Sequence, residues 1–580
     1  MNKIKELAHW ASSRSQITYY WIGILTLILP NLFLSYSMDV SLVGRILNIS
    51  LPLGVWMLIL ALGRKPGKTL LFPFGIMLLI GAVQLVLLTI FEGAVISVDL
   101  LLSLFSASGD EAGELLGGLI LPIALVLVML IVAVYSAICS WRSRLLLSSS
   151  FRRYAGGVGL GIILLSLPLA AWANRIQAQH TLRGDVYPLN VFYNIYITGS
   201  KLSQLAHLDE TSAEHSYHAS SAHSADEPEI YVFVLGETSR AYSYQLYGYP
   251  RPTNPLLSAR DSSSIYLFRD VLTESNTTSK SVPIILSPAD AEHTDRLPHV
   301  RGILTAFKEA GFHTVFISNQ PENRSFLDHF AYEADEHYRI RDIIRSKRSL
   351  MDTRRPIYDG DMLPFLDKVL KKGYRKLFVI MHGYGEHWSY PDRYPSEFSF
   401  FKDDAPRGAR PKEKEKLVNA YDNAIRYNDY FLDAVIKRLE SYTEASTAMY
   451  YTSDHGEDIY DDARERILHS SPTLSYYQLH VPAILWLSPA YRERYQDIAR
   501  TARANERKAA TSRSNLHTLL SLGGINTPER QDSLSLLSPL YREGQRSYLN
   551  DRYECVPLSE MITRTEDLEM FKKMGLKPLK

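Results

Sequence analysis

The residue types best suited to chemistry stand together at Asp454, His455 and Gly456, directly after an apolar, β-prone run at 448–452. A carboxylate beside an imidazole offers the oxygen and nitrogen ligands that zinc binds, and the glycine lets the backbone turn. In an α/β sheet, side chains that follow a buried strand lie at the edge where such folds bind ligands. The segment therefore predicts a metal site, with an ordinary polar turn as the alternative.

Three further β-prone runs end in groups that bind metals or form hydrogen bonds. Glu237 follows the run 230–235, Gln320 follows the run 314–317, and His387 lies shortly after the run 377–381. Because the carboxyl ends of parallel strands converge on one crevice, we expect these side chains to lie near Asp454 and His455. Two carboxylates and an imidazole would form a hydrolase-type metal site with room for a reacting oxygen.

Helical patterns lie between these runs. Val300, Leu304 and Phe307 share one helical face, and the segment 417–439 has the spacing of a longer amphipathic helix. A fifth β-prone run follows at 481–487. Strands that alternate with helices predict an α/β fold with a doubly wound, mainly parallel sheet.

The first third of the chain has the composition of a membrane domain. Five apolar runs occur, at 17–35, 46–62, 70–91, 115–138 and 154–173. Each is close to the length of about 20 residues that a membrane-spanning helix needs. Five such runs in succession argue against the alternative, buried helices of a soluble domain. The sequence therefore predicts an α-helical membrane domain with five spans.

The loops between these runs differ in charge. Basic residues gather before the first run, between the second and third, and between the fourth and fifth, whereas the alternate loops are acidic. Arg45 is the single exception. By the positive-inside rule the N-terminus is cytoplasmic, and five spans place everything after the fifth run outside the cytoplasm.

Length and composition set the domain organisation. The chain has 580 residues, too many for one ordinary core, and its net charge of +1 gives no indication of a nucleic-acid partner. The only cysteines, Cys139 and Cys555, lie far apart and predict no disulfide framework. We expect a five-helix transmembrane domain at 1–175, an interfacial segment and linker at 176–228, an α/β catalytic domain at 229–545 and a C-terminal extension at 546–580.

Over nearly its whole length the chain resembles the membrane phosphoethanolamine transferases of Gram-negative bacteria, a family that includes the colistin-resistance enzymes. The resemblance rests on Gly236-Glu237-Thr238, on Gly248-Tyr249 followed by Thr253-Asn254-Pro255, on Ala420-Tyr421-Asp422-Asn423-Ala424 and on Ser453-Asp454-His455-Gly456-Glu457. The soluble half of that family has the alkaline phosphatase and sulfatase fold. The resemblance implies a multi-pass protein of the bacterial inner membrane with its catalytic domain in the periplasm.

The resemblance also implies a nucleophile. The family's threonine lies five residues before the proline of a Ser-Val-Pro motif, here 281–283, which indicates Thr278, with the neighbouring Thr277 as the alternative. A threonine hydroxyl is a poor nucleophile at neutral pH, but zinc lowers the pKa of bound water from about 15.7 to about 7. A threonine activated in this way would attack a phosphodiester and form a covalent phospho-threonine intermediate.

The remaining site residues are carried over in the same way. The expected zinc ligands are Glu237, Thr278, Asp454 and His455. His387 and His469 match two histidines that serve the ethanolamine-phosphate and a second metal. As general acid and base they would protonate the leaving diacylglycerol and deprotonate the acceptor, with the division between them left open. Gln320 and Arg324 match polar residues that contact phosphate.

The resemblance implies phosphatidylethanolamine as the donor and lipopolysaccharide or lipid A as the acceptor, both of which are membrane lipids. It also implies that the enzyme is a monomer. The chain lacks the cysteine that the lipid A branch has before its threonine, and Ser275-Asn276-Thr277-Thr278 stands there instead. This resembles the cysteine-poor branch whose members modify the lipopolysaccharide core, so the acceptor stays open.

Three alternatives differ in reaction class. A phosphoglycerol transferase of the same superfamily is the main one, because it uses similar ligands and a threonine. A sulfatase is disfavoured because no arginine stands two residues after Pro283. A membrane scaffold without activity is disfavoured because all the inferred ligands are present.

Overall fold

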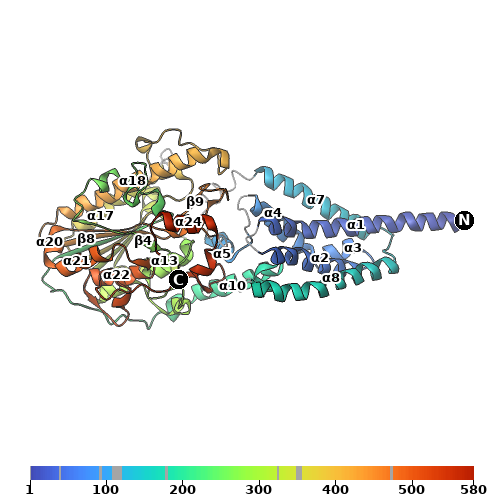
Figure 1. Ribbon diagram of the computed structural model, residues 1–580, viewed down its shortest axis with the longest axis horizontal. Helices are drawn as coiled ribbons and strands as arrows, with labels where there is room; N and C mark the ends of the chain where they lie inside the picture. Colours follow the sequence, from blue (N-terminus) through green and yellow to red (C-terminus); the bar gives the residue numbers. More distant parts are fainter. Residues whose placement is uncertain are drawn as a thin grey trace. The chain divides into compact units, whose positions relative to one another are not determined.

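The computed structural model describes residues 2–37, 41–89, 95–106, 120–176, 181–322, 326–347, 356–469 and 474–579 (Figure 1). The chain divides into two compact units. The first comprises Met1–Leu101 and Asp110–Ser200, and the second comprises Leu102–Gly109 and Lys201–Lys580.

The first unit is helical. Its longer helices are α1 (Asn2–Ser37), α2 (Leu42–Leu62), α4 (Gly75–Leu88), α7 (Ile120–Arg142) and α8 (Ser149–Ile176). Within the described ranges, four segments are long and apolar enough to cross a membrane: Gln16–Tyr36 of α1, and α2, α7 and α8. The four correspond to four of the five predicted spans, with residues 115–119 of the predicted fourth span outside the described residues.

The third predicted span differs from the expectation of one continuous helix. Its described part consists of the short helix α3 (Pro66–Leu71) and the 14-residue apolar helix α4, with Pro73 in the turn between them. Proline has no backbone N–H and its ring clashes with the preceding turn, so it interrupts a helix. Residues 90 and 91 of this span lie outside the described residues.

Close helix packing in the first unit depends on small residues. A Cβ atom on Gly54 of α2 would lie 2.8 Å from the backbone oxygen of Gly159 in α8. Small residues allow two helix backbones to approach in this way, which is typical of helices in membranes. Apolar side chains of α7 such as Leu125 and Ile131 are exposed, as expected for a surface that faces lipid.

The segment predicted to lie at the membrane interface is mostly helical. Its elements are α9 (Leu182–Asp185) and α10 (Leu189–Ala206), and residues 177–180 lie outside the described residues. Phe192 and Tyr196 of α10 are exposed. Two further short helices lie before and after this segment in the sequence, α5 (Val98–Ser106) and α11 (Leu208–Thr211).

The second unit is built on a seven-stranded sheet with the order β3-β11-β8-β2-β7-β5-β6. The strands are β2 (Glu229–Gly236), β3 (Ile265–Phe268), β5 (His313–Ser318), β6 (Glu336–Arg339), β7 (Lys376–His382), β8 (Ser446–Ser453) and β11 (Ala483–Leu487). Every pairing is parallel except the two made by β11. The predicted doubly wound, mainly parallel α/β fold is therefore confirmed.

Helices cover both faces of this sheet (Figure 1). Along β2, Tyr231 and Phe233 belong to one hydrophobic cluster with α14 (Ile303–Glu309) and α22 (Ser514–Leu522), whereas Val232 and Val234 belong to another with α17 (Leu363–Leu370) and α18 (Lys414–Glu440). A strand buried on both sides has no polar face, which explains why β2 is a continuous apolar run in the sequence.

The C-terminal part of the chain packs against the same unit. It contains β14 (Ser547–Leu549), β15 (Cys555–Pro557), α23 (Leu558–Met561) and α24 (Thr565–Lys573). Tyr548 and Phe571 share a hydrophobic cluster with Tyr476 of α19 (Tyr476–Leu479). The other elements that bear on the site are α13 (Thr278–Leu286) and α16 (Ile340–Lys347).

Candidate metal centre and active site

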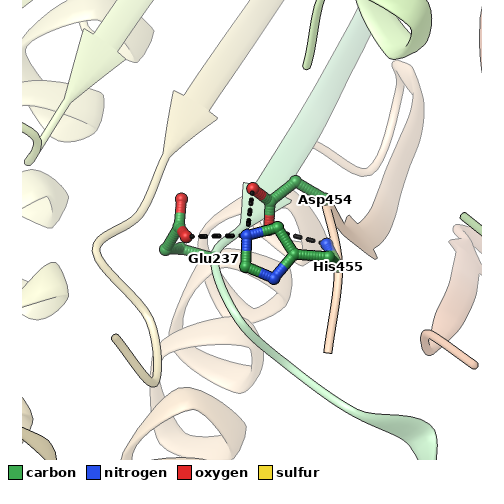
Figure 2. A group of neighbouring side chains, drawn as sticks. All are labelled: Glu237, Asp454 and His455. Atoms are coloured by element: carbon green, nitrogen blue, oxygen red, sulfur yellow. Dashed lines mark hydrogen bonds and ion pairs between the residues drawn. The ribbon is translucent and has the colours of Figure 1, made fainter. Parts of the chain in front are cut away.

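Two adjacent parallel strands bring the three predicted metal ligands together. Gly236 at the end of β2 pairs with Ser453 at the end of β8, so Glu237 and Asp454-His455 leave the sheet side by side. His455 Nε2 lies 3.4 Å from Glu237 Oε1 and 3.3 Å from Asp454 Oδ2 (Figure 2). One ligand atom from each residue lies within 4.8 Å of the others, and all three side chains are buried.

The chemistry of this cluster fits a divalent cation. Burial raises the pKa of Glu237, and the neighbouring charge of Asp454 raises it further. Asp454 Oδ2 makes no hydrogen bond within the described part of the chain. His455 Nδ1 lies 3.0 Å from the carbonyl oxygen of Gly456, which can accept a hydrogen bond from the Nδ1 proton. In that tautomer the lone pair of Nε2 is directed at the carboxylates and is available to a metal. Two carboxylates and one imidazole suit zinc, and the positive charge would offset their desolvation.

Thr278 joins this cluster, whereas Thr277 does not. Thr278 is the first residue of α13, and its Oγ1 lies 3.1 and 3.2 Å from the two Glu237 carboxylate oxygens and 3.3 Å from His455 Nε2. The hydroxyl of Thr277 lies instead 3.4 Å from the Ser275 hydroxyl. The geometry thus favours Thr278 between the two threonines left open by the sequence.

His469 borders the cluster, and His387 is close enough to Glu237 to interact with its charge. The His469 ring centroid is 4.0 Å from that of His455, and its Nδ1 is 3.3 Å from Glu457 Oε1. His387 Nδ1 lies 2.7 Å from the carbonyl oxygen of Trp388. Burial lowers the pKa of His387 to about 4, so its imidazole is neutral at neutral pH.

Glu457 was not assigned a role from the sequence, although it completes the same motif. It is buried, and its Oε2 accepts a hydrogen bond of 2.5 Å from the hydroxyl of Tyr390. Its other oxygen faces His469. A carboxylate held in this way fixes the orientation of a histidine ring and its tautomer.

Gln320 forms a hydrogen bond to Glu237, one of the three predicted metal ligands. Its Nε2 donates to Glu237 Oε2 at 2.9 Å and to the carbonyl oxygen of Gly383 at 3.0 Å. It therefore orients the Glu237 carboxylate. The other residue predicted to contact phosphate, Arg324, lies outside the described residues.

The loop that carries His387 is held by Asp359, which no sequence motif indicated. Asp359 accepts hydrogen bonds from the backbone N–H groups of Tyr384 at 2.8 Å and Gly385 at 3.0 Å. Gly385 has φ +45°, and a Cβ atom there would lie 2.5 Å from the backbone oxygen of Glu237. Only glycine tolerates both the left-handed backbone and this close approach.

A chain of buried hydrogen bonds connects the segment before Thr278 to the metal-ligand loop. Asn276 Nδ2 donates to Gln478 Oε1 at 2.7 Å, and the backbone N–H of Gly456 donates to the Gln478 carbonyl oxygen at 2.8 Å. Thr273 Oγ1 donates to the carbonyl oxygen of Asp454 at 2.6 Å. The segment that carries Thr278 and the three predicted metal ligands are thus fixed relative to one another.

The fold, together with a candidate metal site of two carboxylates and an imidazole beside a helix-initial threonine, defines an enzyme of the alkaline phosphatase type. The sulfatase family model matches residues 229–525, which is more than half of the chain. The protein therefore belongs to the sulfatase family.

Similarity to individual proteins extends over the membrane unit as well. The chain is 25% identical over 564 residues to phosphoethanolamine transferase EptC of Escherichia coli K12, covering 93% of this chain and 94% of the relative. It is 29% identical over 319 residues to phosphoethanolamine transferase EptA of the same strain, covering 54% of this chain and 56% of the relative. The resemblance inferred from the sequence motifs is confirmed.

Two solved structures share the fold. The integral membrane protein lipooligosaccharide phosphoethanolamine transferase A of Neisseria meningitidis has a TM-score of 0.68 and 21% identity, covering 89% of this chain and 97% of that chain. The Zn complex of the C-terminal periplasmic domain of Escherichia coli EptC has a TM-score of 0.53 and 24% identity, covering 60% and 97%. Together with the four apolar helices, these relatives confirm the predicted localisation, a multi-pass membrane protein with a C-terminal periplasmic domain.

Proposed function

We propose that the protein transfers phosphoethanolamine from phosphatidylethanolamine to a lipopolysaccharide acceptor held at the membrane, either lipid A or a core sugar or phosphate. The observation that carries this proposal is the position of Thr278 Oγ1, 3.1 to 3.3 Å from Glu237 and His455. A relative matched over 93% of the chain is named a phosphoethanolamine transferase, which supports the choice of transferred group.

Zinc is the cofactor that the donor set supports. Glu237, Asp454 and His455 would hold it together with the Thr278 hydroxyl. When bound, the ion would supply a Lewis acid that lowers the pKa of the hydroxyl and stabilises negative charge on the phosphoryl oxygens.

The reaction proceeds in two transfers. In the first, Thr278 Oγ1 gives up its proton and forms a bond to the donor phosphorus, and the bond from phosphorus to the diacylglycerol oxygen breaks. That oxygen takes a proton, and phosphoethanolamine stays on Thr278. In the second, an acceptor oxygen loses its proton and forms a bond to the phosphorus, the bond from phosphorus to Thr278 Oγ1 breaks, and that oxygen takes a proton again. In this proposal, His387 and His469 give and take these protons.

The predicted organisation of the chain is part of the proposal. A transmembrane domain at 1–175 and a linker at 176–228 keep the catalytic domain at 229–545 near lipid substrates, and the protein acts as a monomer. Proximity at the interface raises the effective concentration of both lipids. The extension at 546–580 contributes contacts to the nucleophile segment.

The test uses the purified full-length protein in detergent with phosphatidylethanolamine and no acceptor. We expect one added phosphoethanolamine on the peptide that contains Thr278, detected by mass spectrometry. Thr278→Ala should abolish the adduct, and Thr277→Ala should keep it. An adduct formed from phosphatidylglycerol and not from phosphatidylethanolamine would instead support a phosphoglycerol transferase.

A further inference from the structure

Arg341, in the first turn of α16, is fixed in position beside the loops that carry site residues. Its Nε donates a hydrogen bond of 2.5 Å to the backbone oxygen of Asn319, the residue before Gln320. Its guanidinium carbon lies 4.3 Å from the centroid of the Tyr384 ring. Two contacts therefore hold the guanidinium group, and neither uses its terminal nitrogens.

The terminal nitrogens of Arg341 are available to bind a ligand. Within the described ranges, Nη1 and Nη2 of Arg341 make no hydrogen bond and no carboxylate forms an ion pair with the side chain. Two buried arginines of the same unit, by contrast, are paired with carboxylates: Arg240 with Asp461 at 2.6 Å, and Arg546 with Asp270 at 2.7 Å. Arg341 is only partly buried, so a ligand can reach it.

The nearby carboxylate of Asp359 does not fill this role. Its Oδ1 accepts from Asn319 Nδ2 at 2.7 Å and from the Tyr384 N–H at 2.8 Å, and its Oδ2 accepts from the Gly385 N–H at 3.0 Å. These bonds hold the loop of His387. The positive charge of Arg341 is therefore not neutralised by an ion pair within the part of the chain that the structure describes.

Arg341 is adjacent to the reaction site through Tyr384. The Tyr384 ring stacks on His387, with centroids 5.0 Å apart and planes at 14°. The guanidinium carbon of Arg393 lies 4.1 Å from the same ring. Arg393 Nε donates to the carbonyl oxygen of His387 at 2.8 Å, so that second positive charge is held in the loop. The guanidinium groups of Arg341 and Arg393 and the imidazole of His387 thus all lie against the ring of Tyr384.

We propose that Arg341 binds an anionic oxygen of the acceptor, from a phosphate or a carboxylate group, beside His387. A guanidinium group with two unused terminal nitrogens matches the two oxygens of such a group. The inference rests on the proposed function, which places the donor phosphorus at Thr278. The rest of that donor is a cationic ethanolammonium group and a neutral diacylglycerol, so a second anion belongs to the acceptor.

The test separates the two halves of the reaction in the full-length protein in detergent. Release of diacylglycerol from phosphatidylethanolamine with water as acceptor measures the donor half. Transfer to lipid A, which carries phosphates, and to dephosphorylated lipid A that carries an acidic sugar measures the acceptor half. Arg341→Gln keeps an N–H donor for the backbone oxygen of Asn319 but removes the positive charge. Arg341→Lys keeps the charge but lacks the two terminal nitrogens of a guanidinium group.

Arg341→Gln should raise the acceptor KM about 10- to 100-fold, as expected for the loss of hydrogen bonds to a charged group, and leave diacylglycerol release unchanged. Arg341→Lys should show a smaller increase. Arg345→Ala, at an exposed position one turn further along α16, is the matched control and should behave like wild type. A KM increase with only one acceptor identifies the anion as phosphate or carboxylate.

Other outcomes overturn the inference. Equal loss of diacylglycerol release and of transfer in Arg341→Gln would show that Arg341 binds the donor and not the acceptor. Unchanged acceptor KM values in both Arg341 variants would remove the residue from binding altogether. Failure of the wild-type protein to release diacylglycerol would contradict the proposed function itself, which keeps the two failures distinct.

Discussion

The hydroxyl of Tyr548 donates a hydrogen bond of 2.6 Å to Asn276 Oδ1, and so connects the C-terminal extension to the segment that carries Thr278. The backbone supports the same contact, because the Leu549 N–H donates to the carbonyl oxygen of Glu274 at 2.7 Å. Tyr548 is buried. The extension therefore positions the segment that carries Thr278, the proposed nucleophile, in a chain without cysteines at that place.

Tyr548→Phe should lower kcat about 10-fold or more while the donor KM and the zinc content stay at wild-type values. The substitution removes only the hydroxyl, and a small displacement of a reacting group is enough to reduce the rate strongly. Steady-state kinetics of diacylglycerol release and metal analysis provide the measurement.

Tyr491→Phe is the matched control for this prediction. Its hydroxyl also makes a buried bond, 2.8 Å to the carbonyl oxygen of Leu522, but Tyr491 packs near Tyr231 at the opposite end of β2 from Glu237. Each variant should lose about 1 kcal/mol of stability from one hydrogen bond. Equal loss of kcat in the two variants would show that Tyr548 acts through general stability alone.

Sequence patterns predicted the parts of the site that depend on local signals. Strands β2 and β8 are apolar because both faces are buried, and Glu237, Asp454 and His455 follow them directly. Strand β6, with the residues Glu-His-Tyr-Arg, has no apolar run and was not predicted. The antiparallel direction of β11 was not predicted either, because periodicity carries no information on strand direction.

Sequence patterns do not predict contacts between segments that are distant in the chain. Asn276 and Tyr548 are 272 residues apart, and neither belongs to a motif that indicates the other. The position of Arg341 next to Tyr384 likewise depends on the packing of α16 against the β7 loop. Such contacts follow from the tertiary fold, which local periodicity does not encode.

Asp454→Asn should lose zinc from the full-length protein without unfolding it. Asp454 Oδ1 accepts from the backbone N–H groups of His455 at 2.8 Å and Thr238 at 3.1 Å, and an asparagine oxygen keeps both bonds. The change therefore removes only the charge and the Oδ2 ligand atom. Metal analysis alongside a thermal melt gives the measurement.

Asp429→Asn is the control for the zinc experiment. Asp429 is also buried and accepts from the backbone N–H groups of Leu256 and Leu257, on the α18 side of the sheet. Its zinc content should equal that of wild type. Full zinc occupancy in Asp454→Asn would place the metal elsewhere.

The stability of the second unit should depend on the protonation of Glu274. Burial raises the pKa of this carboxyl group from 4.5 to about 7. The stability that this raised pKa contributes is fully present below pH 4.5 and is lost as the pH rises through about 7, because the unfolded chain ionises first. The loss amounts to about 3 kcal/mol, since each pKa unit corresponds to about 1.4 kcal/mol.

Glu274→Gln removes this ionisation and provides the measurement. Glu274 accepts hydrogen bonds from Thr511 Oγ1 at 2.5 Å and from the Ala291 N–H at 2.9 Å, and a glutamine oxygen preserves one of them. The melting temperature of wild type relative to the variant should therefore be higher at pH 5 than at pH 8. A difference that is constant between these pH values would contradict the raised pKa.

Gly385→Ala should reduce both zinc content and turnover, because it disturbs a metal ligand through the backbone. The added Cβ atom would lie 2.5 Å from the Glu237 carbonyl oxygen and 3.0 Å from its backbone nitrogen, and φ is +45°. Gly311→Ala is the matched control, because Gly311 also has a positive φ, +88°, but open space around a Cβ atom. Both variants carry backbone strain of about 1 kcal/mol. Only Gly385→Ala forces Glu237 to move, so metal analysis should separate the two. Equal zinc content in both variants would show that the contact between the β2 and β7 loops does not position the ligand.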